Sequence, residues 1–190
     1  MKALVMLSGG VESTALLKYG LNNSHDVEAL HVVYNNQTAL EGKFARKLAK
    51  HFNIPYSEII IKHQEYSDKH VDEPAADHSW WAAGCLIAGS LAHYDEIWFG
   101  SYLGESAPGA TGPAGVNLIL SAAERNTKVK SPLYLKTKKE QWDTLPPEAQ
   151  DNVISCAKQW KDGKTCIENT DRIMCQKCRE WKKWQIVKDV

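Results

Sequence analysis

Two glycines and three hydroxyl side chains stand together near the N-terminus, in residues 8–14 (Ser-Gly-Gly-Val-Glu-Ser-Thr). The apolar run before them, residues 3–7, is typical of a buried strand, and residues 15–19 are typical of a helix. Backbone N–H groups at a helix start lack intrahelical partners and bind anions, and glycines let the backbone approach a phosphate closely. The segment therefore predicts a phosphate site, with an ordinary glycine turn as the alternative.

The order of residues in this segment excludes two common phosphate loops. No lysine follows the glycines, so the segment is not the Gly-x4-Gly-Lys-Ser/Thr loop of kinases and GTPases. The glycines are not spaced as in Gly-x-Gly-x-x-Gly either. The position directly after the first predicted strand favours a phosphate site over a simple turn.

A second group of reactive side chains lies near the C-terminus. Cys156, Cys166, Cys175 and Cys178 follow the spacing C-x9-C-x8-C-x2-C, and four thiolates match tetrahedral Zn²⁺ in a closed, structural site. Disulfides are the alternative, which a reducing compartment disfavours. The fifth cysteine, Cys85, falls within a predicted buried helix, so we expect it to be inert.

Apolar runs alternate with amphipathic stretches along most of the chain. We expect strands at 3–7, 27–34, 56–61, 96–100 and 128–133, and helices at 40–52, 79–94 and 116–123, besides the one after residue 14. This alternation predicts a three-layer α/β/α fold around a doubly wound, five-stranded parallel sheet, which binds ligands beyond the carboxyl ends of its strands. The glycine- and proline-rich segment 101–117 follows one such end. We expect an irregular functional loop there, with a flexible surface excursion as the alternative.

One lysine is predicted to stand at the start of a later helix. Thr137 and Glu140 have the spacing of a capping box, which places the helix start at Lys138. Pro146 and Pro147 end this element and start another helix. The alternative for Lys138 is a solvated surface position among neighbouring lysines.

Composition limits the class of protein. The chain has 190 residues, 43% hydrophobic, with 23 basic and 23 acidic side chains. The balanced charge argues against a nucleic-acid partner, and we see no run long enough to span a membrane and no signal peptide. We expect a cytoplasmic protein with a nucleotide-binding domain at 1–145 and a helical zinc-binding extension at 146–190.

The segments described above resemble those of a known family. Residues 8–14 are similar to the SGGxDS pyrophosphate loop of the N-type ATP pyrophosphatases (PP-loop superfamily), with Glu12 in place of Asp. This loop together with the four C-terminal cysteines resembles the QueC family of 7-cyano-7-deazaguanine synthases. Pro132-Leu133 followed by Lys138, and the pair Ser155-Cys156, are also similar to segments of that family. The resemblance implies an HUP-type sheet with a zinc-binding extension.

The resemblance also implies an activity. Such an enzyme uses ATP and Mg²⁺ to adenylate 7-carboxy-7-deazaguanine and uses ammonia to form first the amide and then the nitrile, in queuosine biosynthesis. Lys138 and Ser13 would be catalytic, and the four cysteines would hold Zn²⁺. The implied ATP-binding residues are Leu7, Ser8, Gly9, Gly10, Val11, Glu12, Ser13, Thr14 and Gly100. A homodimer is left open, and a phage-encoded protein would act in the host cytoplasm.

Several segments depart from the family pattern. Residues 34–37 read Tyr-Asn-Asn-Gln where the family has Asp-Tyr-Gly-Gln-x-His, and residues 106–113 replace its Ser-Gly-Tyr-Pro-Asp-Cys loop. We therefore expect the activation chemistry to be kept, whereas these segments leave the identity of the acid open. Two alternatives stay open: an adenylating enzyme with another acceptor, such as a tRNA base or a protein, and a non-catalytic nucleotide- or partner-binding module.

Overall fold

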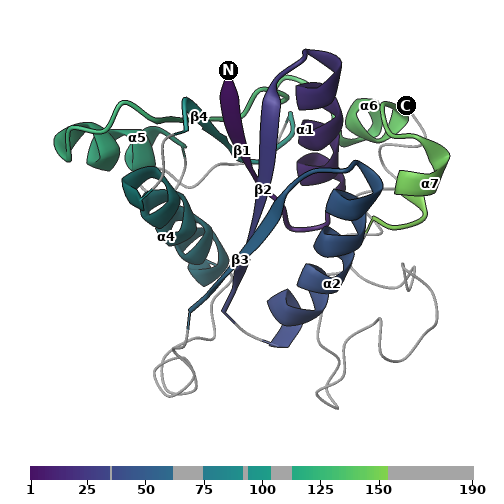
Figure 1. The fold of residues 1–190 in the computed structure, drawn as a ribbon, viewed down its shortest axis with the longest axis horizontal. Helices are drawn as coiled ribbons and strands as arrows, with labels where there is room; N and C mark the ends of the chain where they lie inside the picture. The colour runs from purple at the N-terminus through teal and green to yellow at the C-terminus, as the bar shows by residue number, and fades with distance from the viewer. Residues whose placement is uncertain (35, 62–74, 92–93, 104–112, 154–190) are drawn as a thin grey trace.

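A parallel sheet forms the centre of the molecule (Figure 1). The computed structural model describes residues 1–34, 36–61, 75–91, 94–103 and 113–153. All four strand pairings are parallel, and the strand order is β3-β2-β1-β4-β5. The strands are β1 (Lys2–Met6), β2 (Asp26–Val33), β3 (Tyr56–Ile60), β4 (Glu96–Trp98) and β5 (Lys128–Lys130). The predicted five-stranded parallel sheet is therefore confirmed.

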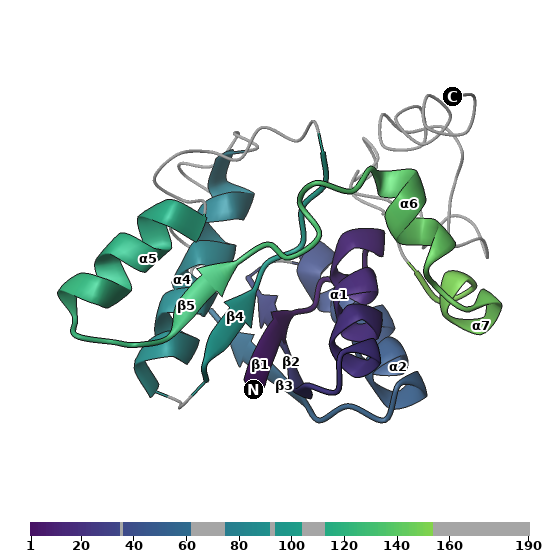
Figure 2. The same cartoon turned by 90° about the horizontal axis from the view of Figure 1, so that it is seen from above.

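Helices cover both faces of the sheet, as Figures 1 and 2 show. One face carries α1, α2, α6 and α7, and the other carries α4 and α5. Their bounds are α1 (Val11–Asn22), α2 (Asn36–His51), α4 (Ala75–Leu91), α5 (Pro113–Ala122), α6 (Lys138–Asp143) and α7 (Pro147–Gln150). This three-layer arrangement is the one that alternating strands and helices predict.

Each face of the sheet has its own apolar core. Successive residues of β1 point to opposite faces: Val5 belongs to the core under α1 and α2, and Leu4 belongs to the core under α4 and α5. Ala149 and Val153 are fully buried in the first core. The predicted C-terminal extension therefore begins within the core of the sheet domain, and its remainder, with all four predicted zinc ligands, lies outside the described residues.

The strand order places a topological switch point beside β1. The chain leaves β1 toward α1 on one face, whereas α4 and α5, before and after β4, lie on the other face. Adjacent strands whose connections go to opposite faces form a topological switch point, where ligands bind beyond the carboxyl ends of the strands. The predicted phosphate segment follows β1 at this point.

Four helices, α1, α2, α4 and α5, begin three or four residues earlier than the sequence pattern indicates. Helix α1 starts at Val11, because Gly10 is extended (φ −77°, ψ 172°) and its carbonyl already accepts a hydrogen bond from the Thr14 N–H at 3.0 Å. Helix α5 starts at Pro113, so residues 113–115, which we expected to belong to the irregular loop, are helical. Proline suits the first helical position, where no N–H is needed.

Other local predictions agree with the structure. Thr137 caps α6 with the expected reciprocal bonds to Glu140, and α7 begins at Pro147. Cys85 is 1% exposed, and burial raises the pKa of its thiol to about 12, as expected for an inert core residue. None of the helices described is long and apolar enough to cross a membrane.

Candidate functional site

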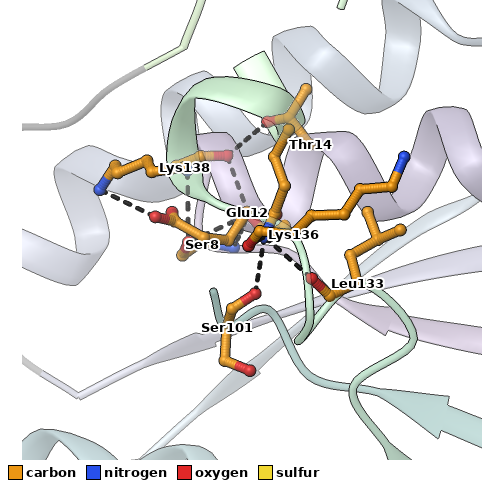
Figure 3. A network of polar contacts seen from close by, with 10 residues as sticks. Ser8, Glu12, Thr14, Ser101, Leu133, Lys136 and Lys138 are labelled. Atoms are coloured by element: carbon orange, nitrogen blue, oxygen red, sulfur yellow. Dashed lines mark hydrogen bonds and ion pairs between the residues drawn. The ribbon is translucent and has the colours of Figure 1, made fainter. Parts of the chain in front are cut away.

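Three separate segments meet beyond the carboxyl ends of β1, β4 and β5 (Figure 3). They are the loop 8–10 with the first turn of α1, the segment 99–103 after β4, and the segment 131–138 that leads into α6. Figure 3 draws Ser8, Glu12, Ser101 and Lys138 from all three segments within one polar network. The site is thus built from distant parts of the chain.

The first segment forms a tight loop that needs glycine. Gly9 has φ 82°, in the left-handed region that favours glycine. The Gly10 N–H donates to Ser8 Oγ at 3.2 Å, which closes the loop before the helix starts. The N–H groups of the first turn of α1 follow directly and have no earlier turn of helix to bond with. This is the geometry of an anion site.

The hydroxyl groups of this segment are turned into the loop itself. Ser13 is 3% exposed, and its Oγ donates to the Gly10 carbonyl at 3.2 Å and lies 3.1 Å from Ser8 Oγ. Thr14 is fully buried, and its Oγ1 donates to the same carbonyl at 2.6 Å. These side chains fix the loop, so an anion would be bound mainly by backbone N–H groups.

A buried histidine supports the base of this loop. His31, on β2, is fully buried, with Nδ1 2.8 Å from the Leu7 carbonyl and Nε2 2.7 Å from the Thr38 carbonyl. Leu7 directly precedes the loop, and Thr38 lies in the first turn of α2. His31 therefore joins the end of β1 to the start of α2.

Gly100 lies against the first turn of α1. A Cβ atom at Gly100 would be 2.9 Å from the Ser13 backbone nitrogen and 3.0 Å from Glu12 Cβ. The first of these distances is shorter than real Cβ atoms show, and it is to backbone, so any larger residue at position 100 would force the backbone to shift. The segment after β4 thus approaches the phosphate loop as closely as two backbones allow.

A buried ion pair links the loop to α6. Lys138 Nζ lies 2.8 Å from Glu12 Oε1, with 6% and 17% of the two side chains exposed. The Nζ also lies 5.4 Å from the centroid of the Tyr102 ring, within cation–π range. The acidic Glu12 is favourable in the first turn of α1, at the positive end of the helix dipole. Lys138 is therefore not the solvated surface lysine of the alternative interpretation.

The structure brings most of the predicted site residues together. The loop residues, Gly100 and Lys138 all lie in the polar network or directly against it. Leu7 and Val11 are fully buried in the apolar core, so they offer only backbone atoms to a ligand. Sequence reasoning missed Tyr102 and Gln141; the spacing of three residues between Lys138 and Gln141 on one helix was the available signal.

The arrangement can bind a polyphosphate and a metal ion. Backbone N–H groups and the Lys138 ammonium offer positive charge, and the Glu12 carboxylate offers the oxygen ligands that Mg²⁺ prefers. Gly9 gives the loop its left-handed turn, and Gly100 lets the segment after β4 lie against the first turn of α1. These features fit the triphosphate of a nucleotide with Mg²⁺ bound to it.

Comparison with known families supports the resemblance over the N-terminal part of the chain. Residues 2–71 match the family described as "Queuosine biosynthesis protein QueC". This region contains β1, the phosphate loop, α1, β2, α2 and β3. The expected resemblance to the QueC family is therefore confirmed for this region, which ends before β4 and Lys138.

Curated relatives match about a third of the chain. A 7-cyano-7-deazaguanine synthase from Archaeoglobus fulgidus is 36% identical over 61 residues, which are 32% of this chain and 26% of that protein. One from Methanoculleus marisnigri is 38% identical over 64 residues, 33% of this chain and 29% of that protein. The chain thus matches little more than a quarter of the length of these relatives.

Solved structures share the fold at low sequence identity. An NMN synthetase from Francisella tularensis has a TM-score of 0.54 at 17% identity, covering 88% of this chain and 71% of that one. A predicted subunit of tRNA methyltransferase from Methanocaldococcus jannaschii scores 0.55 at 13%, covering 75% and 74%. The U34-tRNA thiolase NcsA from Methanococcus maripaludis, with its [4Fe–4S] cluster, scores 0.51 at 16%, covering 76% and 56%. At these identities the likeness shows the fold alone.

Proposed function

We propose that this chain is an ATP-dependent ligase that adenylates the carboxylate of 7-carboxy-7-deazaguanine and converts it with ammonia to the amide and then to the nitrile. The observation that carries the proposal is the buried Lys138–Glu12 ion pair, which lies against a glycine loop at a helix N-terminus. The match of residues 2–71 to the QueC family supports the choice of acid.

The proposed first step transfers AMP to the acid. A carboxylate oxygen attacks the α-phosphorus of ATP, the bond from that phosphorus to the α–β bridging oxygen breaks, and pyrophosphate leaves. Negative charge grows on the departing pyrophosphate, and the Lys138 ammonium with the first N–H groups of α1 would stabilise it. Bound Mg²⁺, held through Glu12, would neutralise the phosphate oxygens.

The later steps use the same site. Ammonia attacks the carbonyl carbon of the acyl adenylate, AMP leaves, and the nitrogen loses a proton to give the amide. The amide oxygen then attacks a second ATP, and loss of AMP and of the remaining N–H protons gives the nitrile. Each activation releases one pyrophosphate and one AMP.

The direct test of this proposal is product analysis. Purified protein incubated with ATP, MgCl₂, ammonium chloride and 7-carboxy-7-deazaguanine should yield AMP, pyrophosphate and the amide or nitrile, detected by liquid chromatography and mass spectrometry. Omission of the acid should reduce AMP formation to background. A folded protein that forms neither AMP nor pyrophosphate in the complete mixture would contradict the proposal.

A second candidate is adenylation of a different acceptor. The segment 34–37 at the end of β2 departs from the family pattern, and the family match ends before the segment that follows β4. These are the parts of the site that would contact the acid. If ATP turnover requires a tRNA or a protein in place of the deazapurine acid, a mass shift on that acceptor would identify it.

We also propose that Cys156, Cys166, Cys175 and Cys178 hold one structural Zn²⁺. The support is chemical: four thiolates satisfy tetrahedral Zn²⁺ and leave no position open for catalysis. We expect one equivalent of zinc by elemental analysis, and we expect its removal by a chelator to lower the melting temperature, because metal binding and local folding are coupled. Absence of zinc together with four fully reactive thiols would refute this.

A further inference from the structure

We propose that Gln141 is a positioning residue, which holds Lys138 and Tyr102 in the arrangement needed for phosphate chemistry. The expected effect of Gln141 on ATP turnover rests on the proposed function. Its effect on the position of Lys138 does not. Gln141 is fully buried and lies on α6, three residues after Lys138 and therefore on the same side of the helix.

The Gln141 amide joins the two loops that follow β4 and β5. Its Nε2 donates to the Ser101 carbonyl at 2.8 Å and to the Leu133 and Lys136 carbonyls at 3.2 Å each. Figure 3 shows these three residues converging beside the phosphate loop. Ser101 belongs to the first of these loops, and Leu133 and Lys136 belong to the second. One side chain thus fixes both loops to α6.

Both loops carry groups that act on Lys138. Tyr102, whose ring faces the Lys138 Nζ at 5.4 Å, directly follows Ser101. The segment from Leu133 to Lys136 leads into the Thr137 cap, which sets where α6 begins and hence where Lys138 stands. The Leu103 N–H donates to the Lys136 carbonyl at 2.9 Å, which joins the two loops a second time.

The carbonyl oxygen of the Gln141 amide indicates that this side chain does more than fill space in the core. Gln141 Oε1 is buried and has no hydrogen-bond partner among the residues that the structure describes. A buried acceptor without a partner is unfavourable, and an apolar side chain of the same length would avoid it. An apolar side chain cannot share two N–H donors among the carbonyl groups of both loops. The chain therefore keeps the amide for the loops it holds.

The experiment compares two glutamines with the same chemistry. Gln141→Met removes the donors and keeps the length of the side chain. Gln150→Met is the matched control, because Gln150 Nε2 donates at 3.2 and 3.1 Å to the Trp142 and Leu145 carbonyls, which belong to the end of α6 and the turn after it and not to the two loops. The first readout is acetylation of Lys138 by an N-hydroxysuccinimide ester, measured by peptide mass spectrometry. The second is the kcat and KM for ATP in AMP formation.

We expect Gln141→Met to raise the acetylation rate of Lys138 at least fivefold and to lower kcat at least tenfold, with KM for ATP changed less than threefold. Gln150→Met should leave all three unchanged. If Gln141→Met does not fold, Gln141→Asn, which keeps the amide but shortens its reach, should show the same pattern to a smaller degree.

Lys138 acetylation and ATP turnover test the positioning role of Gln141 and the proposed function separately. Wild-type protein without ATP turnover, combined with faster Lys138 acetylation in Gln141→Met, contradicts the proposed function and supports the positioning role. A folded Gln141→Met protein with wild-type acetylation of Lys138 overturns the positioning role, whatever its turnover. Equal effects of Gln141→Met and Gln150→Met would also overturn it, because a loss of general stability would then explain both.

Discussion

Replacing Lys138 with methionine should lower the rate of AMP formation by about 10²–10³-fold, the usual effect of removing one group that stabilises transition-state charge. Methionine keeps most of the length of the side chain but removes the ammonium that lies 2.8 Å from Glu12. The charge that develops on pyrophosphate would then be stabilised by Mg²⁺ and backbone dipoles alone, without the ammonium. The measurement is AMP release under saturating ATP and acid.

The same substitution should destabilise the fold. It leaves the Glu12 carboxylate, only 17% exposed, without its counter-charge, and loss of one partner of a buried ion pair costs about 3 kcal/mol or more. Glu12→Gln in the Lys138→Met background should restore most of this loss, because neither side chain is then charged. Urea unfolding of the two single variants and the double variant gives the coupling between the side chains.

The neighbouring lysine provides the control. Lys139 also lies in the first turn of α6, but its side chain is 43% exposed and pairs with Asp143 one turn along the surface. Surface pairs of this kind contribute about 0.5 kcal/mol or less, so Lys139→Met should leave AMP formation and stability nearly unchanged. Equal losses in Lys138→Met and Lys139→Met would contradict the role given to the buried ion pair.

Gly100→Ala should weaken ATP binding. The new methyl group would lie 2.9 Å from the Ser13 backbone nitrogen, so the first turn of α1 or the segment after β4 must move. Misplacement of catalytic groups by about 1 Å can cost 10²-fold in rate, and crowding of this kind costs about 1–3 kcal/mol in stability. Calorimetric titration with MgATP should show weaker binding.

A glycine on the other face of the sheet tests whether crowding alone is responsible. A Cβ atom at Gly89 would also meet an atom at 2.9 Å, but that atom is Cδ2 of the Leu120 side chain, which can rotate. Gly89 packs α4 against α5, away from the loop. We therefore expect Gly89→Ala to lower stability slightly and to leave MgATP binding unchanged. Wild-type affinity in Gly100→Ala would show that the close approach is not needed.

Much of the fold follows from local sequence signals. The strands β1 to β3 carry apolar runs of ordinary length, and their bounds differ from the predicted ones by at most one residue at either end. The capping box of Thr137 and Glu140 places the start of α6 correctly, because cap chemistry is contained within four residues. The prediction of a phosphate loop also depends on adjacent residues, and the structure places that loop at the switch point of the sheet.

Features that depend on contacts between distant segments could not be predicted from local sequence signals. Nothing near Glu12 in the sequence identifies Lys138 as its partner, because that contact requires the complete sheet and the docking of α6. The need for glycine at position 100 comes from the Ser13 backbone, not from a turn with positive φ. Strands β4 and β5 are also shorter than predicted, since the apolar residues after them serve the loops and the core.

The ion pair between Glu12 and Lys138 joins an early part of the chain to a late one. A protein is synthesised from its N-terminus, so the phosphate loop and α1 leave the ribosome long before α6 does. Until α6 has emerged and docked, the Glu12 carboxylate has no counter-charge and must stay in contact with water. A nascent chain that ends before residue 138 therefore cannot complete the anion site. Retention on immobilised ATP would consequently distinguish released, fully folded chains from those still being synthesised.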